Sequence, residues 1–198
     1  MKKIKFSLNL GILGHDDSDK NLFINYLKKI ALTSDALKDE NEFLILYEDI
    51  PLKIHVFNAE SFKSFINNSD KIIRIDVLLV LIDIYNPNAL DIMLFKDLEE
   101  FKAIYIFKGV SILVGVDRLS IEGILPLDKW RISRINLIQE TKNLEFLYCF
   151  EVQNSDYDIA EIYRKIFNNF LLKLKNSNLE LLKQAKNYGE KLKDQFNY

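Results

Sequence analysis

The sequence contains little cysteine, proline and glycine: one, three and six residues among 198. A single cysteine, Cys149, cannot form an internal disulfide, which is typical of proteins from a reducing compartment, and we expect a cytoplasmic location. Scarce glycine and proline predict long regular elements with few tight turns. No run approaches the ~20 apolar residues of a membrane span, and acidic residues soon follow the first apolar stretch. We therefore expect neither a transmembrane helix nor a signal peptide.

The chain also lacks an excess of positive charge over negative charge. The formal net charge is −2, whereas nucleic-acid-binding domains usually carry a basic surface, so we expect no nucleic-acid partner. The composition, 48% hydrophobic and 28% charged, is typical of a folded globular domain, and the length is that of one domain.

Apolar runs alternate along the chain with segments of helical periodicity. The helical pattern after the first strand has Ser18 or Asp19 as its expected N-cap. Residues 60–73 predict a short helix or an irregular loop. Two runs joined around Ile50 and Pro51 predict an antiparallel hairpin, and the strand that contains Cys149 is expected to bury it. The predicted strands cover 4–13, 43–49, 52–57, 77–84, 110–116 and 146–152, and the predicted helices cover 20–32, 89–107, part of 119–142 and a long stretch from Asp158.

This alternation predicts an α/β fold with a six-stranded, mostly parallel sheet and one antiparallel edge strand. The domain is expected to span residues 1–174. A polar break follows it, and residues 175–198 predict an amphipathic C-terminal helix, which either docks on a protein partner or a second copy or folds back on its own domain. Its apolar stripe consists of Leu182, Ala185, Tyr188, Leu192 and Phe196.

Four segments have a recognisable order. Residues 14–21 read Gly-His-Asp-Asp-Ser-Asp-Lys-Asn; residues 76–90 predict a strand, a turn and a helix; residues 111–119 predict a strand ending in Val-Asp-Arg-Leu; and residues 146–167 predict a last strand and helix. Residues 14–21 resemble the phosphate loop (G-x-x-x-x-G-K-S/T) of the Ras-like small GTPase family, and residues 76–90 resemble its fourth strand. Residues 111–119 resemble its base-reading strand (N-K-x-D), and residues 146–167 resemble its final strand and helix. The resemblance covers roughly residues 4–172 and implies a three-layer P-loop NTPase fold.

The motifs themselves depart from the family pattern. Gly14 and Lys20 match the phosphate loop, but Asp19 replaces its second glycine, where a side chain obstructs the phosphate. Asn21 replaces the hydroxyl residue that ligates Mg²⁺. The D-x-x-G motif has no counterpart in residues 57–61, and Asp117 is the one acidic remnant of the base-reading motif. The resemblance thus implies Gly14, Lys20, Asn21 and Asp117 as nucleotide-binding remnants, and no catalytic or metal-binding residue.

Several residues have alternative interpretations. Asp16, Asp17 and Asp19 are an acidic helix start favoured by the helix dipole, a divalent-metal site or an altered nucleotide site. Lys20 is either a surviving phosphate lysine or a helix-start lysine paired with a neighbouring aspartate. Asp117 either accepts from a guanine edge or faces solvent in a loop.

These observations lead to three hypotheses of function. We expect a catalytically inactive, Ras-like pseudo-GTPase that acts as a protein-interaction or regulatory module, with a protein partner or a second copy and no cofactor. The alternative is a divergent small GTPase that binds GTP or GDP weakly with Mg²⁺. A third hypothesis is a phospho-receiver domain, in which residues 15–19 resemble the acidic Mg²⁺ pocket and Asp83 would be the phosphate acceptor.

Overall fold

The computed structural model describes residues 6–32, 41–67, 74–90, 92–104, 107–124 and 130–196, without the side chains of residues 92–95, 195 and 196. The strands are β1 (Phe6–Leu13), β2 (Glu42–Tyr47), β3 (Ile50–Ala59), β4 (Val77–Asp83), β5 (Val110–Val116) and β6 (Tyr148–Val152). The helices are α1 (Asp17–Ile30), α2 (Phe62–Asn67), α3 (Ile92–Ile104), α4 (Arg118–Ile121), α5 (Arg134–Asn143), α6 (Ser155–Ser177) and α7 (Leu179–Phe196).

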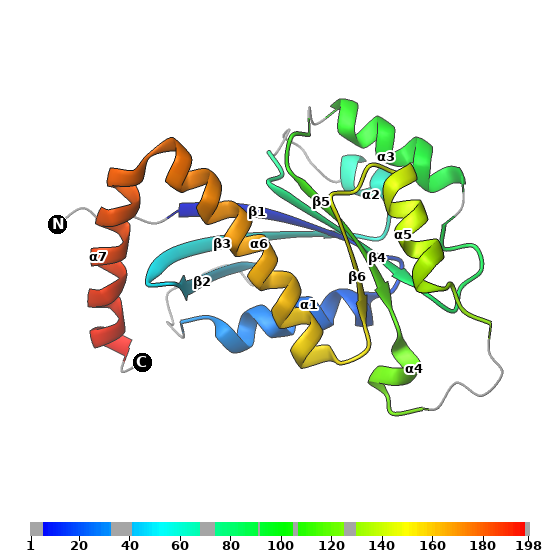
Figure 1. Cartoon of the computed structure of the whole chain (residues 1–198), viewed down its shortest axis with the longest axis horizontal. Coiled ribbons are helices and arrows are strands. Elements are labelled where there is room, and N and C mark those ends of the chain that lie inside the picture. The colour runs from blue at the N-terminus through cyan, green and yellow to red at the C-terminus, as the bar shows by residue number, and fades with distance from the viewer. Residues whose placement is uncertain are drawn as a thin grey trace.

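The strands form one six-stranded sheet in the order β2-β3-β1-β4-β5-β6. All neighbouring strands pair in parallel except β2 and β3, which form an antiparallel hairpin at one edge. Figure 1 shows the sheet between two sets of helices. The prediction of an α/β fold with a mostly parallel sheet and one antiparallel edge strand is therefore confirmed.

Two apolar clusters lie on the two faces of the sheet. One packs β-strand side chains such as Leu10 against α1 and α6, where Phe23 and Tyr163 are fully buried. The other packs side chains such as Val80 against α2, α3 and α5, with Phe101 at its centre. Every residue of β5 is buried, as expected of a strand covered on both faces.

Local details differ from the sequence predictions. Helix α1 begins at Asp17 and its N-cap is Asp16, because the Asp16 carboxylate accepts the Ser18 N–H at 2.7 Å. The hairpin turns at Glu48 and Asp49, whose φ angles are 49° and 65°, and not at Ile50 and Pro51. Two consecutive left-handed residues give the backbone twist that a two-residue hairpin needs.

Cys149 is only half-buried, which corrects the expectation of a core position. It lies on β6, an outer strand of the sheet with a single neighbouring strand. In the predicted segment 60–73, α2 occupies 62–67, and residues 68–73 lie outside the described part of the chain.

Helix α7 folds back on the hairpin, which agrees with the second of the two alternatives for this helix, folding back on its own domain. Ala185 and Leu192 are 0% and 6% exposed, and Leu182 packs against the same cluster as α1 and α6. Tyr188 is half-buried on the same helix, and the side chain of Phe196 lies outside the described residues.

Two further contacts hold α7 in this place. Gly189 approaches the backbone of Asp49 so closely that a Cβ would lie 2.7 Å from the Asp49 carbonyl carbon. Lys186 and Lys193 both form ion pairs with the Asp49 carboxylate. Within the described residues, no helix is long and apolar enough to cross a membrane.

Candidate functional site

A cavity of about 460 Å³ opens at the carboxyl ends of β1, β3 and β4. Within the sheet, β3 lies beside β1 in one direction and β4 lies beside it in the other. The strand order therefore reverses at β1, which marks a topological switch point. Open α/β sheets bind ligands in the crevice at such a point. The polar lining includes Gly14, Asp16, Asp19, Glu60, Asp83, Asp97 and Arg118.

The start of α1 borders this cavity, and two backbone donors at or near this helix start are engaged within the chain. A helix N-terminus attracts anions because its first N–H groups lack intrahelical partners. Here the Gly14 N–H donates to the Ala59 carbonyl at 3.1 Å, and the Ser18 N–H donates to Asp16 Oδ1 at 2.7 Å. The Asp16 carboxylate thus occupies the kind of position that a phosphate takes at a helix start.

Arg118 holds two of the acidic residues at this helix start. Its Nε donates to Asp19 Oδ1 at 2.9 Å, and its Nη2 lies 2.5 Å from Asp16 Oδ2. Arg118 is the first residue of α4 and lies two residues after the end of β5. The end of β5 is therefore tied to the start of α1 by side chains of the chain itself.

The two carboxylates respond differently to this environment. Hydrogen bonds from Ser18 and from Arg118 lower the pKa of Asp16 to about 2. Burial raises the pKa of Asp19, although Arg118 opposes the shift. The pKa of Arg118 is raised, chiefly by its hydrogen bond to Asp19. At neutral pH the guanidinium is charged, and we expect its charge to be largely balanced by the two carboxylates.

Lys20 does not reach the cavity. Its side chain is 4% exposed, and its Nζ lies 2.9 Å from Asp17 Oδ1. This contact supports the interpretation of Lys20 as a helix-start lysine paired with a neighbouring aspartate. Asn21 is exposed on α1, and neither Lys20 nor Asn21 lines the cavity. Among the four remnant positions, only Gly14 does.

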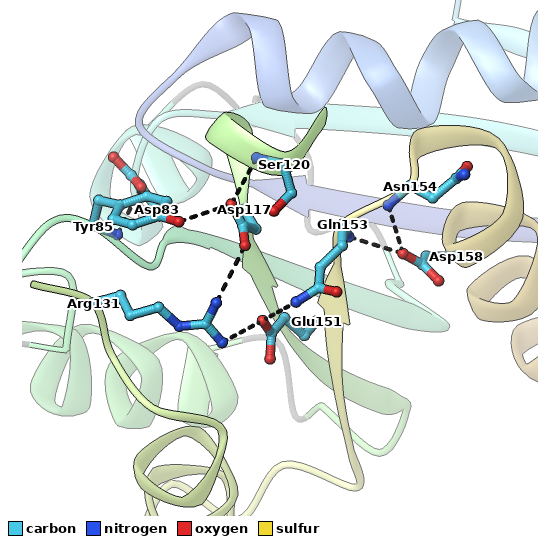
Figure 2. A network of polar contacts seen from close by, with 9 residues as sticks. All are labelled: Asp83, Tyr85, Asp117, Ser120, Arg131, Glu151, Gln153, Asn154 and Asp158. Atoms are coloured by element: carbon cyan, nitrogen blue, oxygen red, sulfur yellow. Dashed lines mark hydrogen bonds and ion pairs between the residues drawn. The ribbon is translucent and has the colours of Figure 1, made fainter. Parts of the chain in front are cut away.

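Asp117 is completely buried, which contradicts the interpretation of a solvent-facing loop residue. Figure 2 shows its carboxylate at the centre of a polar network. One oxygen accepts from the Tyr85 hydroxyl at 3.0 Å and from the Ser120 N–H at 3.0 Å, and the other accepts from Arg131 at 3.3 Å. The carboxylate therefore has structural partners on both oxygens.

The same network continues to the loop between β6 and α6. Arg131 also donates to Glu151 at 2.9 Å (Figure 2). The backbone N–H groups of Gln153 and Asn154 both donate to Asp158 Oδ2 at 2.8 Å. These two donors are thus satisfied by a side chain of α6.

Sequence reasoning missed Arg118, Tyr85 and Arg131, the residues that engage the acidic side chains. The available signal was composition: arginine occurs five times in the chain, and one arginine directly follows Asp117. Arginine is preferred where a carboxylate is held by a fixed fork of donors.

Metal binding has no support from the described side chains. Among them, no group of three or more His, Cys, Asp or Glu residues has the arrangement of a metal site. Asp83 lines the cavity, and its Oδ1 accepts the Tyr85 N–H at 2.9 Å. Asp16 and Asp19 lie on the same cavity, but both face Arg118.

A comparison of the chain with protein-family models and with curated proteins finds no match.

Proposed function

We propose that this chain is a Ras-like pseudo-GTPase domain that neither binds nor hydrolyses GTP and acts as a protein-interaction module. The observation that carries the proposal is the ion-paired group of Asp16, Asp19 and Arg118 at the start of α1. It lies where the resemblance places the phosphates of a nucleotide.

The first support is electrostatic. Two unit charges of the same sign at 4 Å repel by ~1 kcal/mol in water and by ~4 kcal/mol near a protein surface. A polyphosphate at this helix start would meet the carboxylates of Asp16 and Asp19, with Glu60 and Asp83 on the same cavity wall. Arg118, the only lysine or arginine among the described lining residues, is already paired. A bound polyphosphate would therefore have to displace these carboxylates from Arg118.

The second support comes from the base-reading half of the site. Asp117 would have to leave Tyr85, Ser120 and Arg131 before its carboxylate could accept from a base. A buried acceptor that loses its partners costs about 1–3 kcal/mol, and more when it is charged. In both halves of the expected nucleotide site, the acidic side chains therefore already have partners within the chain.

The protein-interaction role is supported by large apolar side chains that are exposed on the surface. Trp130 is 58% exposed, and Ile135, on α5, is 78% exposed. Ile138 follows one turn later and is 41% exposed. Large exposed apolar and aromatic side chains are characteristic of protein-interaction surfaces.

Titration calorimetry with GTP and with GDP, each with Mg²⁺, tests the nucleotide half of the proposal. We expect no binding tighter than high micromolar, and a nanomolar dissociation constant would contradict the proposal. The double variant D19G/N21S restores the G-x-x-x-x-G-K-S pattern at positions 14–21. If the carboxylate of Asp19 is the main obstacle, this variant gains affinity relative to the wild type, provided that circular dichroism shows it folded.

Light scattering and crosslinking test the interaction half. A second copy as partner predicts a concentration-dependent increase in mass of the purified chain. A different partner predicts a monomer that captures a defined protein in a fixed stoichiometry. A chain that remains monomeric and captures nothing at high concentration would count against an interaction role.

The divergent GTPase remains the second candidate, and the observation in its favour is the 460 Å³ cavity at the switch point, with Gly14 in its wall. The calorimetry above decides between the two. The receiver hypothesis is weaker because β2 and β3 form a hairpin where that fold has a strand, a helix and a strand.

A further inference from the structure

A second cavity lies at the opposite ends of the strands, where β4 and β5 begin. It has a volume of about 670 Å³, and none of its described lining residues lines the first cavity. Its walls are the segments leading into β4 and β5 and the C-terminal half of α6, which Figure 1 shows crossing the sheet. This volume lies within the roughly 300–1,000 Å³ of small-molecule sites.

Apolar side chains form most of the wall. Ile75, Val77, Val110 and Ile166 line the cavity and are each at most 4% exposed. Three further lining side chains are only partly buried, so apolar surface remains open to a ligand; they are Phe107, Phe170 and Leu174. An apolar ligand group would therefore find a hydrophobic surface here.

The single carboxylate among the described wall residues already has partners. Asp76 Oδ2 accepts the Asn9 N–H at 3.0 Å, and Oδ1 lies 3.4 Å from Arg74. The Asp76 carbonyl accepts the Val110 N–H at 3.0 Å, which joins the two wall segments. The carboxylate thus belongs to the framework of the cavity.

Among the described residues that line the cavity, positive charge exceeds negative charge. Arg74, Lys108 and Lys173 line the cavity, and all three are exposed. Lys108 and Lys173 form no ion pair with any side chain in the described part of the chain. Two lysines, one before β5 and one on α6, therefore flank the opening without a charged partner among the described side chains.

One buried polar atom also lies in this wall. Asn169 lines the cavity, and its Oδ1 is buried without a hydrogen-bond partner among the described residues. Its Nδ2 makes only a long contact of 3.4 Å to the Tyr148 hydroxyl. An orphaned buried acceptor calls for an explanation, and a water held in the cavity would satisfy it.

We propose that this cavity binds a small amphipathic carboxylate: an apolar chain against Ile166, Phe170 and Leu174, and an anionic head between Lys108 and Lys173. Ammonium groups on flexible stems bind an anion while their methylenes cover apolar surface. None of the described residues of this site lines the proposed pseudo-GTPase pocket, so either proposal can fail without the other.

Decanoate, kept below its micellar concentration, is the probe for this site. Amide NMR shifts are followed during titration, with decanol as the uncharged chain and acetate as the head without a chain. We expect saturable shifts for decanoate at residues 74–77, 107–110 and 166–177, with weaker binding of decanol and none of acetate. Shifts elsewhere, or equal affinity for decanoate and decanol, would overturn the assignment.

Variants locate the two parts of the ligand. K108Q/K173Q removes both lysine charges, and we expect about tenfold weaker decanoate binding, about threefold for each exposed lysine. The matched control K175Q/K183Q removes two exposed lysines that do not line the cavity, and its affinity should equal that of the wild type. Equal losses in the two double variants would show that only overall charge matters, which contradicts a site here.

A third variant tests occupancy of the cavity. Leu174→Trp places a larger side chain at a partly exposed wall position, where we expect the chain to remain folded. Decanoate binding should then fall at least tenfold while the wild-type unfolding midpoint is retained. Unchanged binding by a folded L174W variant would overturn the proposal.

Discussion

Arg118 Nε lies 2.9 Å from Asp19 Oδ1, a contact between residues 99 positions apart in the sequence. The Asp19 side chain is 6% exposed, so its charge depends on this guanidinium for compensation. The pair joins the start of α1 to the residue that follows β5 and Asp117. The two segments that the family resemblance assigns to phosphate and to base are therefore linked directly.

Removing the cation should destabilise the fold. In Arg118→Gln the buried carboxylate of Asp19 loses its charged partner, and we expect the free energy of unfolding to fall by about 1–3 kcal/mol. Urea unfolding followed by circular dichroism measures the change. Arg134→Gln is the matched control, since Arg134 is exposed on α5. The double variant R118Q/D19N should recover part of the loss, and additive losses would show that the two residues are not coupled.

The pH dependence of stability should reveal Asp16. Its pKa in the folded chain is about 2, below the ordinary value, so it stabilises the fold above pH ~4, and this contribution disappears as the pH falls toward 2. Asp16 is substantially exposed, so we expect an effect of under ~1 kcal/mol. Asp16→Asn retains an N-cap and should flatten the stability curve between pH 4 and 2.

Urea unfolding at a series of pH values between 2 and 5 tests this expectation. Asp194→Asn, an exposed change on α7, is the control and should leave the curve unaltered. Asp19 acts in the opposite direction, because its raised pKa favours the protonated form in the fold and so favours stability at lower pH. A steeper curve for D16N than for the wild type would contradict the assignment of the lowered pKa to Asp16.

The sheet could be predicted because its signals are local. The nearly continuous apolar run at 77–84 requires cover on both faces, and β4 occupies 77–83. The hairpin could be predicted from two β-type runs that lie close together in the sequence. The position of its turn could not, because it depends on positive φ angles at Glu48 and Asp49, which these residue types do not predict.

The candidate site could not be predicted to the same degree, because its contacts are between distant residues. The sequence around Asp117, an aspartate that follows a strand, does not indicate whether the residue lies in a buried network or in a solvent-facing loop. The outcome depended on Tyr85 and Arg131, which come from other segments. In the same way the apolar stripe of α7 indicated a buried face without showing that the β2–β3 hairpin covers it.

The docking of α7 depends on the absence of a side chain at Gly189. In Gly189→Ala the new Cβ would overlap the Asp49 backbone and lie 3.2 Å from Pro51 Cδ, so α7 must shift away from the hairpin. Exposure of Ala185 and Leu192 would follow, and we expect stability to fall by about 2–4 kcal/mol. Hydrogen exchange measures the protection of α7.

Asn187→Ala serves as the control for that experiment, because Asn187 is an exposed position two residues earlier on the same helix. Alanine has a higher helix propensity than either residue it replaces, so a loss in G189A cannot come from propensity. Retained protection of α7 in G189A would show that the helix tolerates the displacement and that the close approach to Asp49 is not what positions it.

Asp117→Asn separates a structural carboxylate from one that reads a base. Asparagine keeps an acceptor for Tyr85 and Ser120 but removes the charge opposite Arg131, so we expect a loss of about 1–3 kcal/mol in stability. Under the proposed function, calorimetry with GDP and Mg²⁺ gives the same absence of tight binding for D117N as for the wild type. If Asp117 instead accepted a hydrogen bond from guanine, the wild type would bind GDP and D117N would bind it more weakly. A measurable wild-type affinity that D117N abolishes, in a variant shown to be folded, would therefore favour the divergent GTPase over the pseudo-GTPase.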